Sequence, residues 1–293
     1  MKTWITIFYF AVFVPDISFC AISLNAKNLK TLRDGRKYLQ PINPFSLKKL
    51  RHSNLNLPKF YDLQKEYPDC ISLKNIKNQR NCGACWAFAS TGAYADALCI
   101  SKNISVDPSP QYSMNCDKFC PPEPYQDRCD DGCKGGTLYM STLWLNENHI
   151  VDEKCFPYAA DKKQCSSECN ASDVQLQKYP QMCGGTLRDN SVKGMRAALY
   201  HYGSLLVGFF VYDDFNQYHG GVYKQKTGRQ TDYHAVRIVG WGEEDDGSPY
   251  WIIQNSWGEN WGEKGRFRMA AGINDCIIEE EYYFFFPCDE FEG

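Results

Sequence analysis

Two cysteines three positions apart, Cys82 and Cys85, stand just before a long apolar run and are the first residues in the chain that could do chemistry. From Trp86 to Leu98 nearly every residue is apolar or small and none is proline, which predicts a buried helix that begins at or near Cys85. The backbone N–H groups and the positive dipole end at the start of a helix favour a thiolate over a thiol. Cys85 is therefore a candidate nucleophile.

The cysteine pair alone is more typical of half of a zinc site or of the ends of structural disulfides than of a catalytic nucleophile. A catalytic thiolate also needs a histidine partner. The chain has five histidines, at His52, His149, His201, His219 and His234. Only His234 opens a predicted strand, which continues to Gly242. A histidine at such a position is more often structural than catalytic, so its role depends on its neighbours.

The strand predicted next leads into Asn255-Ser256-Trp257-Gly258. An amide at the end of an adjacent strand could accept the second ring N–H of His234, which would fix the tautomer and direction of the imidazole. The residue types and their order are therefore those of a nucleophile, its base and an orienting amide.

Two kinds of structure must position these residues. The first half contains predicted helices at 86–98 and 137–148, a chain break at 107–110, and a cysteine-rich loop from Cys116 to Cys133. After about residue 186 a helix at 191–202 is followed by short runs that predict antiparallel strands. These runs are Leu205–Tyr212, Ala235–Trp241, Tyr250–Gln254, Arg266–Met269 and Tyr282–Phe286. A cleft between a helical half and a β-rich half would be a natural active site.

The composition of the chain limits which functional classes and which cellular compartments are compatible with it. A net charge of −3 gives no reason to expect nucleic-acid binding, and 15 cysteines are typical of an oxidising compartment. Residues 1–20 have the basic start, apolar centre and small-residue end of a signal peptide, and no later run is long enough to span a membrane. Asn103 and Asn170 begin N-glycosylation triplets, which fit the same route.

Residues 21–56 differ in charge from the rest of the chain. They carry eight Lys or Arg residues against the single acid Asp34, a net charge of +7, so residues 57–293 carry about −10. Residues 21–56 contain no cysteine and are basic, whereas the part of the chain that follows is acidic. This predicts a removable propeptide that docks on that acidic part by electrostatic attraction. The alternative is a solvated basic tail with no role.

At this point the sequence resembles the papain-like cysteine peptidases, and within them the cathepsin B branch. The resemblance rests on Cys82-Gly83-Ala84-Cys85-Trp86, on His234 at 149 residues and Asn255 at 170 residues after Cys85, and on the Asn-Ser-Trp-Gly motif. It covers about residues 57–287. It implies an α+β, two-lobe peptidase domain at 57–293, with a helical, disulfide-rich left lobe (about 70–185) and an antiparallel, β-barrel-like right lobe (about 186–293).

The resemblance also assigns roles to single residues. Cys85 would be the nucleophile and His234 its proton partner, with Asn255 orienting the imidazole. Gln79, six residues before Cys85, would donate from its side-chain amide to the oxyanion. Trp257 would shield the His–Asn hydrogen bond from water. Gly135, Gly136 and Ala235 would line the substrate cleft.

Two further expectations concern specificity. Glu279 would place an acid at the base of the S2 pocket, so that Arg as well as apolar side chains would be accepted at P2; the alternative is a surface glutamate in the run Glu279–Glu281. The occluding loop of cathepsin B is missing, since Cys155 is followed nine residues later by Gln164-Cys165 and no His-His pair exists. An open primed side predicts endopeptidase activity. Arg80, where the family usually has glycine, places a charge near the cleft.

The resemblance implies five disulfides and leaves three cysteines unassigned. The implied pairs are Cys70–Cys99, Cys82–Cys133, Cys116–Cys165, Cys120–Cys129 and Cys155–Cys169. Cys85 is expected to stay free, and Cys183, Cys276 and Cys288 have no implied partner.

The expected partners are protein and peptide substrates, the chain's own propeptide as inhibitor, and inhibitors of the cystatin type. No cofactor or metal is expected, and the compartment is the secretory route, either a lysosome-like vacuole or the outside of the cell. A catalytically silent papain-like scaffold is the alternative. Such scaffolds usually lose the nucleophile or the histidine, whereas here Cys85, His234, Asn255 and Gln79 are all present.

Overall fold

The computed structural model of the chain describes residues 56–120, 129–170, 174–186 and 190–288. The predicted signal peptide, and all of the predicted propeptide except its last residue, lie outside the described residues. Within the described part of the chain, no helix has the length and apolar character needed to cross a membrane.

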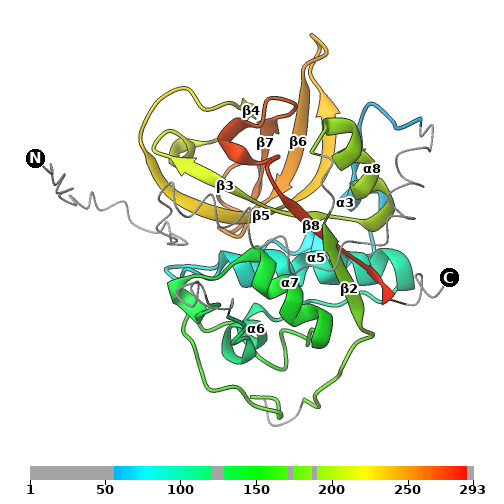
Figure 1. Cartoon of the computed structure of the whole chain (residues 1–293), viewed down its shortest axis with the longest axis vertical. Coiled ribbons are helices and arrows are strands. Elements are labelled where there is room, and N and C mark those ends of the chain that lie inside the picture. Colours follow the sequence, from blue (N-terminus) through cyan, green and yellow to red (C-terminus); the bar gives the residue numbers. More distant parts are fainter. Residues whose placement is uncertain (1–55, 121–128, 171–173, 187–189, 289–293) are drawn as a thin grey trace, which may run out of the picture.

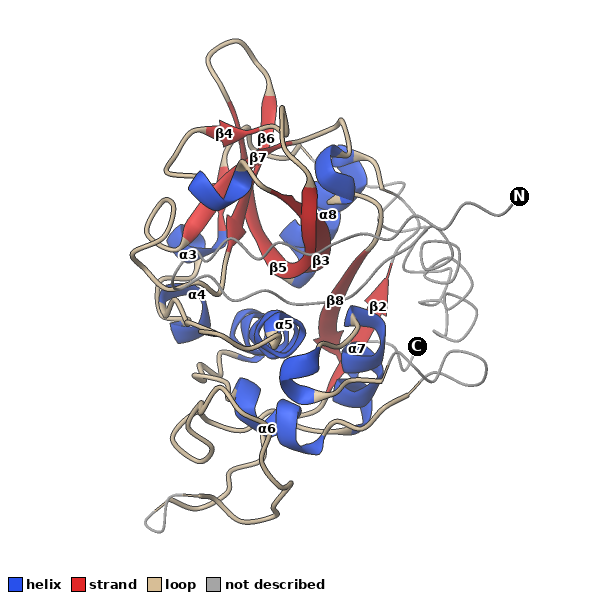
Figure 2. Ribbon diagram, turned by 90° about the vertical axis from the view of Figure 1, so that its left-hand side faces the viewer, coloured by secondary structure: helices blue, strands red, loops and turns tan. Residues whose placement is uncertain are grey.

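The central element is helix α5 (Cys85–Lys102), which lies between the remaining helices of the left lobe and the sheet (Figure 2). Its residues from Cys85 to Cys99 are all buried, so the helix has no polar face. This agrees with a sequence that is apolar or small on every side. The helix ends where Asn103 adopts a left-handed conformation with φ of 54°, a usual way to terminate a helix. The helix begins at Cys85, as the apolar run predicted.

Two further helices complete the left lobe below α5 (Figure 1): α6 (Pro110–Cys116) and α7 (Leu138–Glu147). The prediction of a chain break at 107–110 missed α6. Ser109 caps this helix because its Oγ accepts from the N–H of Tyr112 at 3.1 Å, and Pro110 occupies the first helical position, where a proline loses no hydrogen bond. The short elements α3 (Leu63–Glu66), α4 (Ile71–Lys74) and the 3₁₀ turn η2 (Gly132–Lys134) lie in the same half of the sequence.

The strands form one sheet in the order β2-β8-β3-β5-β6-β7-β4, with β1 added beside β5. Their bounds are β1 Tyr61–Asp62, β2 Met182–Thr186, β3 Leu205–Tyr212, β4 Val222–Tyr223, β5 Gln230–Glu243, β6 Pro249–Gln254, β7 Arg266–Ala270 and β8 Tyr282–Pro287. All neighbours are antiparallel except the parallel pair β4–β7. The expectation of a barrel-like lobe is wrong in this respect, because the described strands form an open path with β2 and β4 as edge strands that do not pair with each other.

Helix α8 (Val192–Tyr202) and the short turns η3 (Phe215–Gln217) and η4 (Asp275–Ile277) complete the right lobe. The two cores do not follow the predicted boundary at residue 186. Tyr61 and Leu63, near the start of the described chain, pack in the core of the right lobe. Phe285 on β8 packs instead with α5 and α7 in the left lobe, where Figures 1 and 2 show the β2–β8 pair descending beside α7. Each lobe is therefore completed by a segment from the other half of the sequence.

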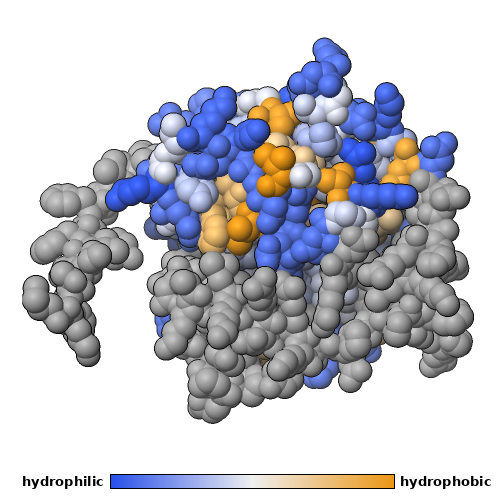
Figure 3. Space-filling view, turned by 45° about the horizontal axis from the view of Figure 1, so that its top comes forward, coloured by the Kyte–Doolittle hydropathy of each residue, from blue (hydrophilic) through white to orange (hydrophobic). Residues whose placement is uncertain are grey.

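The surface of the described residues carries apolar side chains only in separate places. Figure 3 shows one face of the molecule, on which the described residues are mostly hydrophilic with small apolar groups between them. The exposed large apolar side chains belong to separate segments: Phe60, Ile71, Tyr200 and Ile273. This distribution is ordinary for a globular protein and marks no single large docking face among the described residues.

Six disulfides link the described residues. Five of them join the pairs that the resemblance implies: Cys70–Cys99, Cys82–Cys133, Cys116–Cys165, Cys120–Cys129 and Cys155–Cys169. The sixth, Cys183–Cys288, pairs two of the three cysteines that sequence could not assign. The third, Cys276, is a buried free thiol whose pKa is raised to about 12, chiefly by burial.

Candidate active site

Cys85 is the first residue of α5, and its side chain is almost fully buried. The N–H groups of the first helical turn have no acceptor one turn earlier in the helix, so this position favours a negatively charged sulfur. The structure corrects one expectation, however, because the sulfur of Cys85 is disulfide-bonded and is not the free thiol expected from the sequence.

His234 lies in β5 and Asn255 directly follows β6, the strand beside it. The Nε2 of His234 and the Oδ1 of Asn255 are 2.7 Å apart. The same Oδ1 accepts the backbone N–H of Ser256 at 2.8 Å, which identifies it as the acceptor and His234 Nε2 as the donor. The other ring nitrogen, Nδ1, is buried and has no hydrogen-bond partner among the described residues. It is therefore available to take a proton.

The indole of Trp257 covers the His–Asn pair. Its ring stacks on that of His234 at a centroid distance of 4.8 Å and an interplanar angle of 30°. Phe209 contacts the same imidazole at 5.9 Å. Burial lowers the pKa of His234 to about 4, and the hydrogen bond to Asn255 opposes this by favouring the charged ring. Trp257 thus lies where the resemblance places the shielding tryptophan.

Gln79 is fully buried and links the start of the domain to the strand end that carries Asn255. Its Nε2 donates to the carbonyl of Cys82 at 2.9 Å, and its Oε1 accepts the hydroxyl of Ser256 at 2.6 Å. Its backbone N–H donates to the carbonyl of Ser256 at 2.8 Å. Because Oε1 is used as an acceptor, the amide is oriented, and one Nε2 hydrogen is left for a further acceptor.

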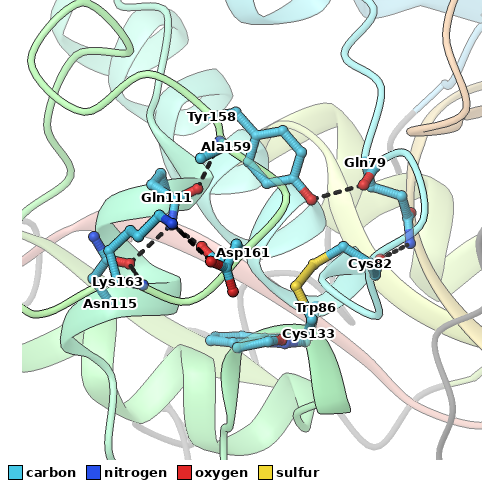
Figure 4. Close-up of a disulfide and its surroundings, with 11 residues drawn as sticks. Gln79, Cys82, Trp86, Gln111, Asn115, Cys133, Tyr158, Ala159, Asp161 and Lys163 are labelled. Atoms are coloured by element: carbon cyan, nitrogen blue, oxygen red, sulfur yellow. Dashed lines mark hydrogen bonds and ion pairs between the residues drawn. A yellow bond between two sulfur atoms is a disulfide. The ribbon is translucent and has the colours of Figure 1, made fainter.

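Tyr158 was missed at the sequence level, and it holds the backbone of Gln79. Its hydroxyl donates to the Gln79 carbonyl at 2.7 Å, as Figure 4 shows, above the Cys82–Cys133 disulfide. Ser256 was also missed as a functional residue, although it stands inside the Asn-Ser-Trp-Gly motif. No local pattern around Tyr158 points to Gln79, because the two residues are 79 positions apart.

Two glycines are expected in the substrate cleft, and each occupies a position that disfavours a side chain. At Gly135 the reason is the backbone conformation, and at Gly136 it is the lack of space. Gly135 has φ of 120°, a region that favours glycine. A Cβ on Gly136 would lie 2.6 Å from Oδ1 of Asp130 and 2.6 Å from the Trp86 ring. Both glycines are buried, and neither position has a side chain that would separate its backbone from a neighbouring group.

Ala235 follows His234 in β5, faces Gly208 of β3 in the register, and packs in the same core cluster as Cys85. That shared cluster, together with the packing of α5 on β5, places the Cys85 and His234 elements against each other.

Glu279 does not match its expected place in a substrate pocket. It is only 4% exposed, and its Oε1 accepts the indole N–H of Trp251 at 2.8 Å and the N–H of Gly272 at 2.7 Å. Its Oε2 accepts the N–H of Asn274 at 2.7 Å. These donors hold the carboxylate inside the right lobe, where it supports the turn before η4.

The described residues contain no group of three or more His, Cys, Asp or Glu side chains that could hold a metal ion. In the zinc interpretation of the cysteine pair Cys82 would be a ligand, whereas it is bonded to Cys133. The arrangement can provide a nucleophilic sulfur, an oriented imidazole and an oriented amide donor. These are the parts needed for acyl transfer through a covalent intermediate.

Comparison with known proteins gives the same class. The model of the family described as "Papain family cysteine protease" matches residues 57–286. Cathepsin B-like CP2 of Giardia intestinalis is 36% identical over 233 residues, covering 78% of this chain and 74% of the relative. Cathepsin B-like cysteine proteinase 1 of Ostertagia ostertagi is 33% identical over 268 residues, covering 79% and 73%.

Solved structures agree with the sequence relatives. The structure of proCathepsin B S9 from Trypanosoma congolense superposes with a TM-score of 0.74 at 28% identity, covering 85% of this chain and 82% of that one. The structure of the bromelain protease from Ananas comosus, in complex with the E64 inhibitor, superposes with a TM-score of 0.64 at 27% identity. It covers 78% of this chain and 99% of that one. The chain belongs to the papain family of cysteine proteases and is a cathepsin B-like cysteine peptidase.

Proposed function

We propose that the chain is a cysteine endopeptidase in which Cys85 is the nucleophile and His234 the proton partner. The observation that carries this proposal is the 2.7 Å hydrogen bond between His234 Nε2 and Asn255 Oδ1, which leaves Nδ1 buried and without a hydrogen-bond partner. An imidazole whose Nε2–H is fixed in this way presents its other nitrogen as the base.

In the proposed reaction, the sulfur of Cys85 attacks the scissile carbonyl carbon after its proton has passed to His234. Gln79 donates its remaining amide hydrogen to the oxyanion of the tetrahedral intermediate. As the C–N bond breaks, His234 returns its proton to the leaving amine and the acyl group stays on sulfur. Neutral His234 then takes a proton from water, the hydroxide attacks the thioester, and the acid product and the thiol are released.

The low pKa of His234 is consistent with these roles. Burial favours the neutral ring while the Cys85 sulfur is held in a disulfide. A Cys85 thiolate facing Nδ1 would add an opposite charge and raise that pKa. The proposal therefore requires an added thiol reductant, which becomes oxidised to its own disulfide as it releases the Cys85 sulfur as a thiol, before an ion pair can form.

The proposed maturation rests on the composition and charge of residues 1–56. Residues 1–20 would be removed as a signal peptide, and residues 21–56 would act as an inhibitory propeptide. The solved structure of proCathepsin B S9, a proform, supports a zymogen by analogy. Six disulfides among the described residues support an oxidising compartment of the secretory route.

We assign the proposed preference for Arg at P2 to Glu281 instead of Glu279. Glu281 is partly exposed, and its Oε1 accepts the hydroxyl of Tyr283. Burial, together with the negative charge of Glu281, raises the pKa of Tyr233, the residue directly before His234. A partly exposed acid near Tyr233 could pair with an Arg side chain at P2, whereas the Glu279 carboxylate already accepts three hydrogen bonds inside the right lobe.

The test of the nucleophile uses an epoxide that alkylates only activated thiolates, applied to the full chain after activation in a reducing buffer. We expect stoichiometric labelling of Cys85 and loss of peptidase activity. Labelling should vanish in Cys85→Ser and fall strongly in His234→Ala. Gln79→Ala should still be labelled but should cleave peptides about 10²- to 10³-fold more slowly in kcat. An activated chain that neither reacts with the epoxide nor cleaves peptides would instead indicate the silent scaffold.

The test of endopeptidase action uses peptide libraries with free and with blocked C-termini. The stretch after Cys155 has no pair of histidines to capture a substrate carboxylate. We therefore expect cleavage within peptides regardless of the C-terminal group. Removal of dipeptides from free C-termini only would contradict an open primed side.

A further inference from the structure

A buried acid lies in the contact between the two lobes, on the helix that carries Cys85. Asp96 of α5 has no solvent-exposed surface. Its Oδ1 accepts the hydroxyl of Ser72 at 2.6 Å. Its Oδ2 accepts the hydroxyl of Ser204 at 2.6 Å and a guanidinium N–H of Arg237, which lies in β5. The ion pair Asp96–Arg237 therefore joins the central helix of the left lobe to the sheet of the right lobe.

Arg237 extends this link to the strand end that carries Asn255. Its Nη2 donates to the carbonyl of Ser72 at 3.3 Å, and Nε2 of Gln254 donates to the same oxygen at 3.2 Å. Arg237 and Gln254 face each other in the β5–β6 register. Arg237 comes three residues after His234, and Gln254 directly precedes Asn255. The network thus touches both strands that supply the His–Asn pair.

The helix side of the network is fitted to the guanidinium. Cys85, Ala89, Gly92 and Asp96 follow one another at spacings of four, three and four residues, so they share one face of α5. A Cβ on Gly92 would lie 2.6 Å from the Cζ of Arg237. The absence of a side chain at Gly92 therefore allows the guanidinium to lie against the helix backbone between Cys85 and Asp96.

Stability alone is a poor explanation for this arrangement. Moving two charges out of water costs about as much as their attraction returns, so buried ion pairs add little net stability. What such a pair does add is a fixed geometry, because the planar guanidinium donates in defined directions. Here those directions connect the elements that carry the nucleophile, the imidazole and the orienting amide.

We propose that Asp96 and Arg237 are positioning residues that set the relative placement of Cys85, His234 and Asn255. Neither touches the substrate, and both act through the backbone of α5, β5 and β6. The inference rests on the proposed catalytic roles of those three residues. It predicts that loosening the pair reduces the rate of the chemical step while substrate binding and folding are retained.

The charged groups around the network are few. Asp96 faces Arg237 from α5, and Arg266 of β7 lies near both and pairs with Asp62 at 3.1 Å. His234 itself contacts Asn255 and the rings of Trp257 and Phe209, and Asp232 and Tyr233 precede it in β5. None of these groups is changed in the test below except Asp96 and Arg237.

The test compares Arg237→Lys with wild type in the full chain, activated in a reducing buffer. Lysine keeps the charge but cannot reach Asp96 and the Ser72 carbonyl together. We expect kcat to fall about 10- to 100-fold with little change in KM, as for a small misplacement of reacting groups. The rise of the Cys85 alkylation rate by iodoacetamide should move to higher pH, because a weaker His234–Asn255 hydrogen bond destabilises the charged imidazole that pairs with the thiolate.

A double variant separates positioning from stability. Asp96→Leu/Arg237→Met replaces both charges with apolar groups, so it should fold, with a Tm lowered only by the acceptors that the Ser72 and Ser204 hydroxyls lose. Its kcat should nevertheless fall as in Arg237→Lys. Arg268→Lys, which weakens the ion pair to Glu263 on the outer part of β7, is the matched control and should leave kcat and the alkylation profile unchanged.

Two results would overturn the inference: a folded Arg237→Lys with the kcat and alkylation profile of wild type, or a folded double variant with the kcat of wild type. The pH dependence of Cys85 alkylation distinguishes a failure of this inference from a failure of the proposed peptidase function. A wild-type chain that cleaves no peptide would contradict the proposed function, whereas the shift in Cys85 alkylation between wild type and Arg237→Lys would still decide whether the pair positions the site.

Discussion

Gln79 is held at each of its polar groups, which matters for a side chain proposed to stabilise an oxyanion. Ser256 accepts its backbone N–H and donates its hydroxyl to Oε1, while Cys82 accepts one Nε2 hydrogen. Tyr158 donates to its carbonyl. A donor fixed in this way needs no reorganisation as charge develops on the substrate oxygen, and this preorganisation is a large source of catalysis.

Tyr158→Phe tests whether this support affects the rate. The variant leaves the buried Gln79 carbonyl without its 2.7 Å donor, which costs about 1–3 kcal/mol. We expect a lower kcat with a smaller effect on KM, measured with a peptide amide substrate. Tyr94→Phe is the matched control, because its hydroxyl bonds Pro180 and Met182, far from Gln79 in the sequence. If both variants lower kcat equally, the effect of Tyr158 is one of general stability.

Glu279→Gln and Glu281→Gln should have different consequences. At Glu279 an amide NH₂ would face the backbone N–H groups that now bond a carboxylate, so the free energy of unfolding should fall by about 1–3 kcal/mol. The kcat/KM for substrates with Arg at P2 should change little in this variant. Glu281→Gln should instead lower kcat/KM for substrates with Arg at P2 relative to Leu at P2. The opposite pattern would restore Glu279 as the specificity residue.

The sequence could show the motif residues but could not rank equivalent side chains within a run. Cys85, His234 and Asn255 stand in patterns that specify their order, and the structure brings the last two into hydrogen-bond contact. The three glutamates at 279–281 are identical in sequence terms. Only the tertiary donors from Trp251, Gly272 and Asn274 decide which carboxylate is buried.

At the scale of elements, a pair of buried acids supports the segment that contains Gly135 and Gly136. Asp117 follows α6, and its carboxyl group lies against that of Asp130, seven residues before Thr137. Asp130 Oδ1 accepts the N–H of Thr137 at 2.7 Å, and the Oδ2 atoms of both acids are buried without a donor. Burial raises the pKa of Asp117 to about 6 and the pKa of Asp130 well above its usual range. Lys162, which pairs with Asp131, opposes both shifts.

These raised pKa values predict that the protein is more stable in acid. A carboxyl group whose pKa is higher in the folded state stabilises fully below its unfolded pKa of about 4, and that stability is lost as the pH rises through 6. Asp117→Asn removes one titrating group and gives Asp130 an amide donor. We expect urea unfolding between pH 4 and 7 to show a loss of stability smaller than in wild type by on the order of 2 kcal/mol.

The control for this prediction is Asp161→Asn, which changes an exposed acid in the nearby loop. It should leave the pH dependence of unfolding as in wild type. A variant Asp117→Asn with an unchanged pH dependence would contradict the idea that the acid pair holds a proton.

Helices and strands with a clear period were predicted well, and elements without one were missed. Helix α8 and strand β3 start and end within one residue of their predicted bounds. Strand β2, with the sequence Met-Cys-Gly-Gly-Thr, has no strand propensity of its own and forms because β8 provides its hydrogen-bond partners. Helix α6 was missed because Pro110 was taken as a breaker rather than as the first helical residue.

At the scale of the whole molecule, the lobes are completed by chain segments that cross between them. Tyr61 and Leu63 pack in the right lobe, while Phe285, from the C-terminal strand β8, packs in the left. The prediction of a single boundary at residue 186 could not include such crossings. A hydrophobic pattern indicates that a side chain is buried, but it does not indicate which segment of the chain packs against it. For the same reason cysteine spacing left Cys183 and Cys288 unassigned, although they meet at the β2–β8 pair.

The Cys183–Cys288 disulfide should therefore contribute more to stability than the shorter crosslinks. It spans 105 positions, whereas Cys155–Cys169 spans 14. In the chain-entropy view, the longer loop restricts the unfolded chain more, by about 2 kcal/mol. We expect the double variant Cys183→Ala/Cys288→Ala to lose more unfolding free energy in urea, and to melt at a lower temperature, than Cys155→Ala/Cys169→Ala. Equal losses would mean that strain or residual structure outweighs loop length. The peptidase activity of the first variant at 25 °C should persist, because β5 and β6 hold His234 and Asn255 through contacts that the β2–β8 crosslink does not touch.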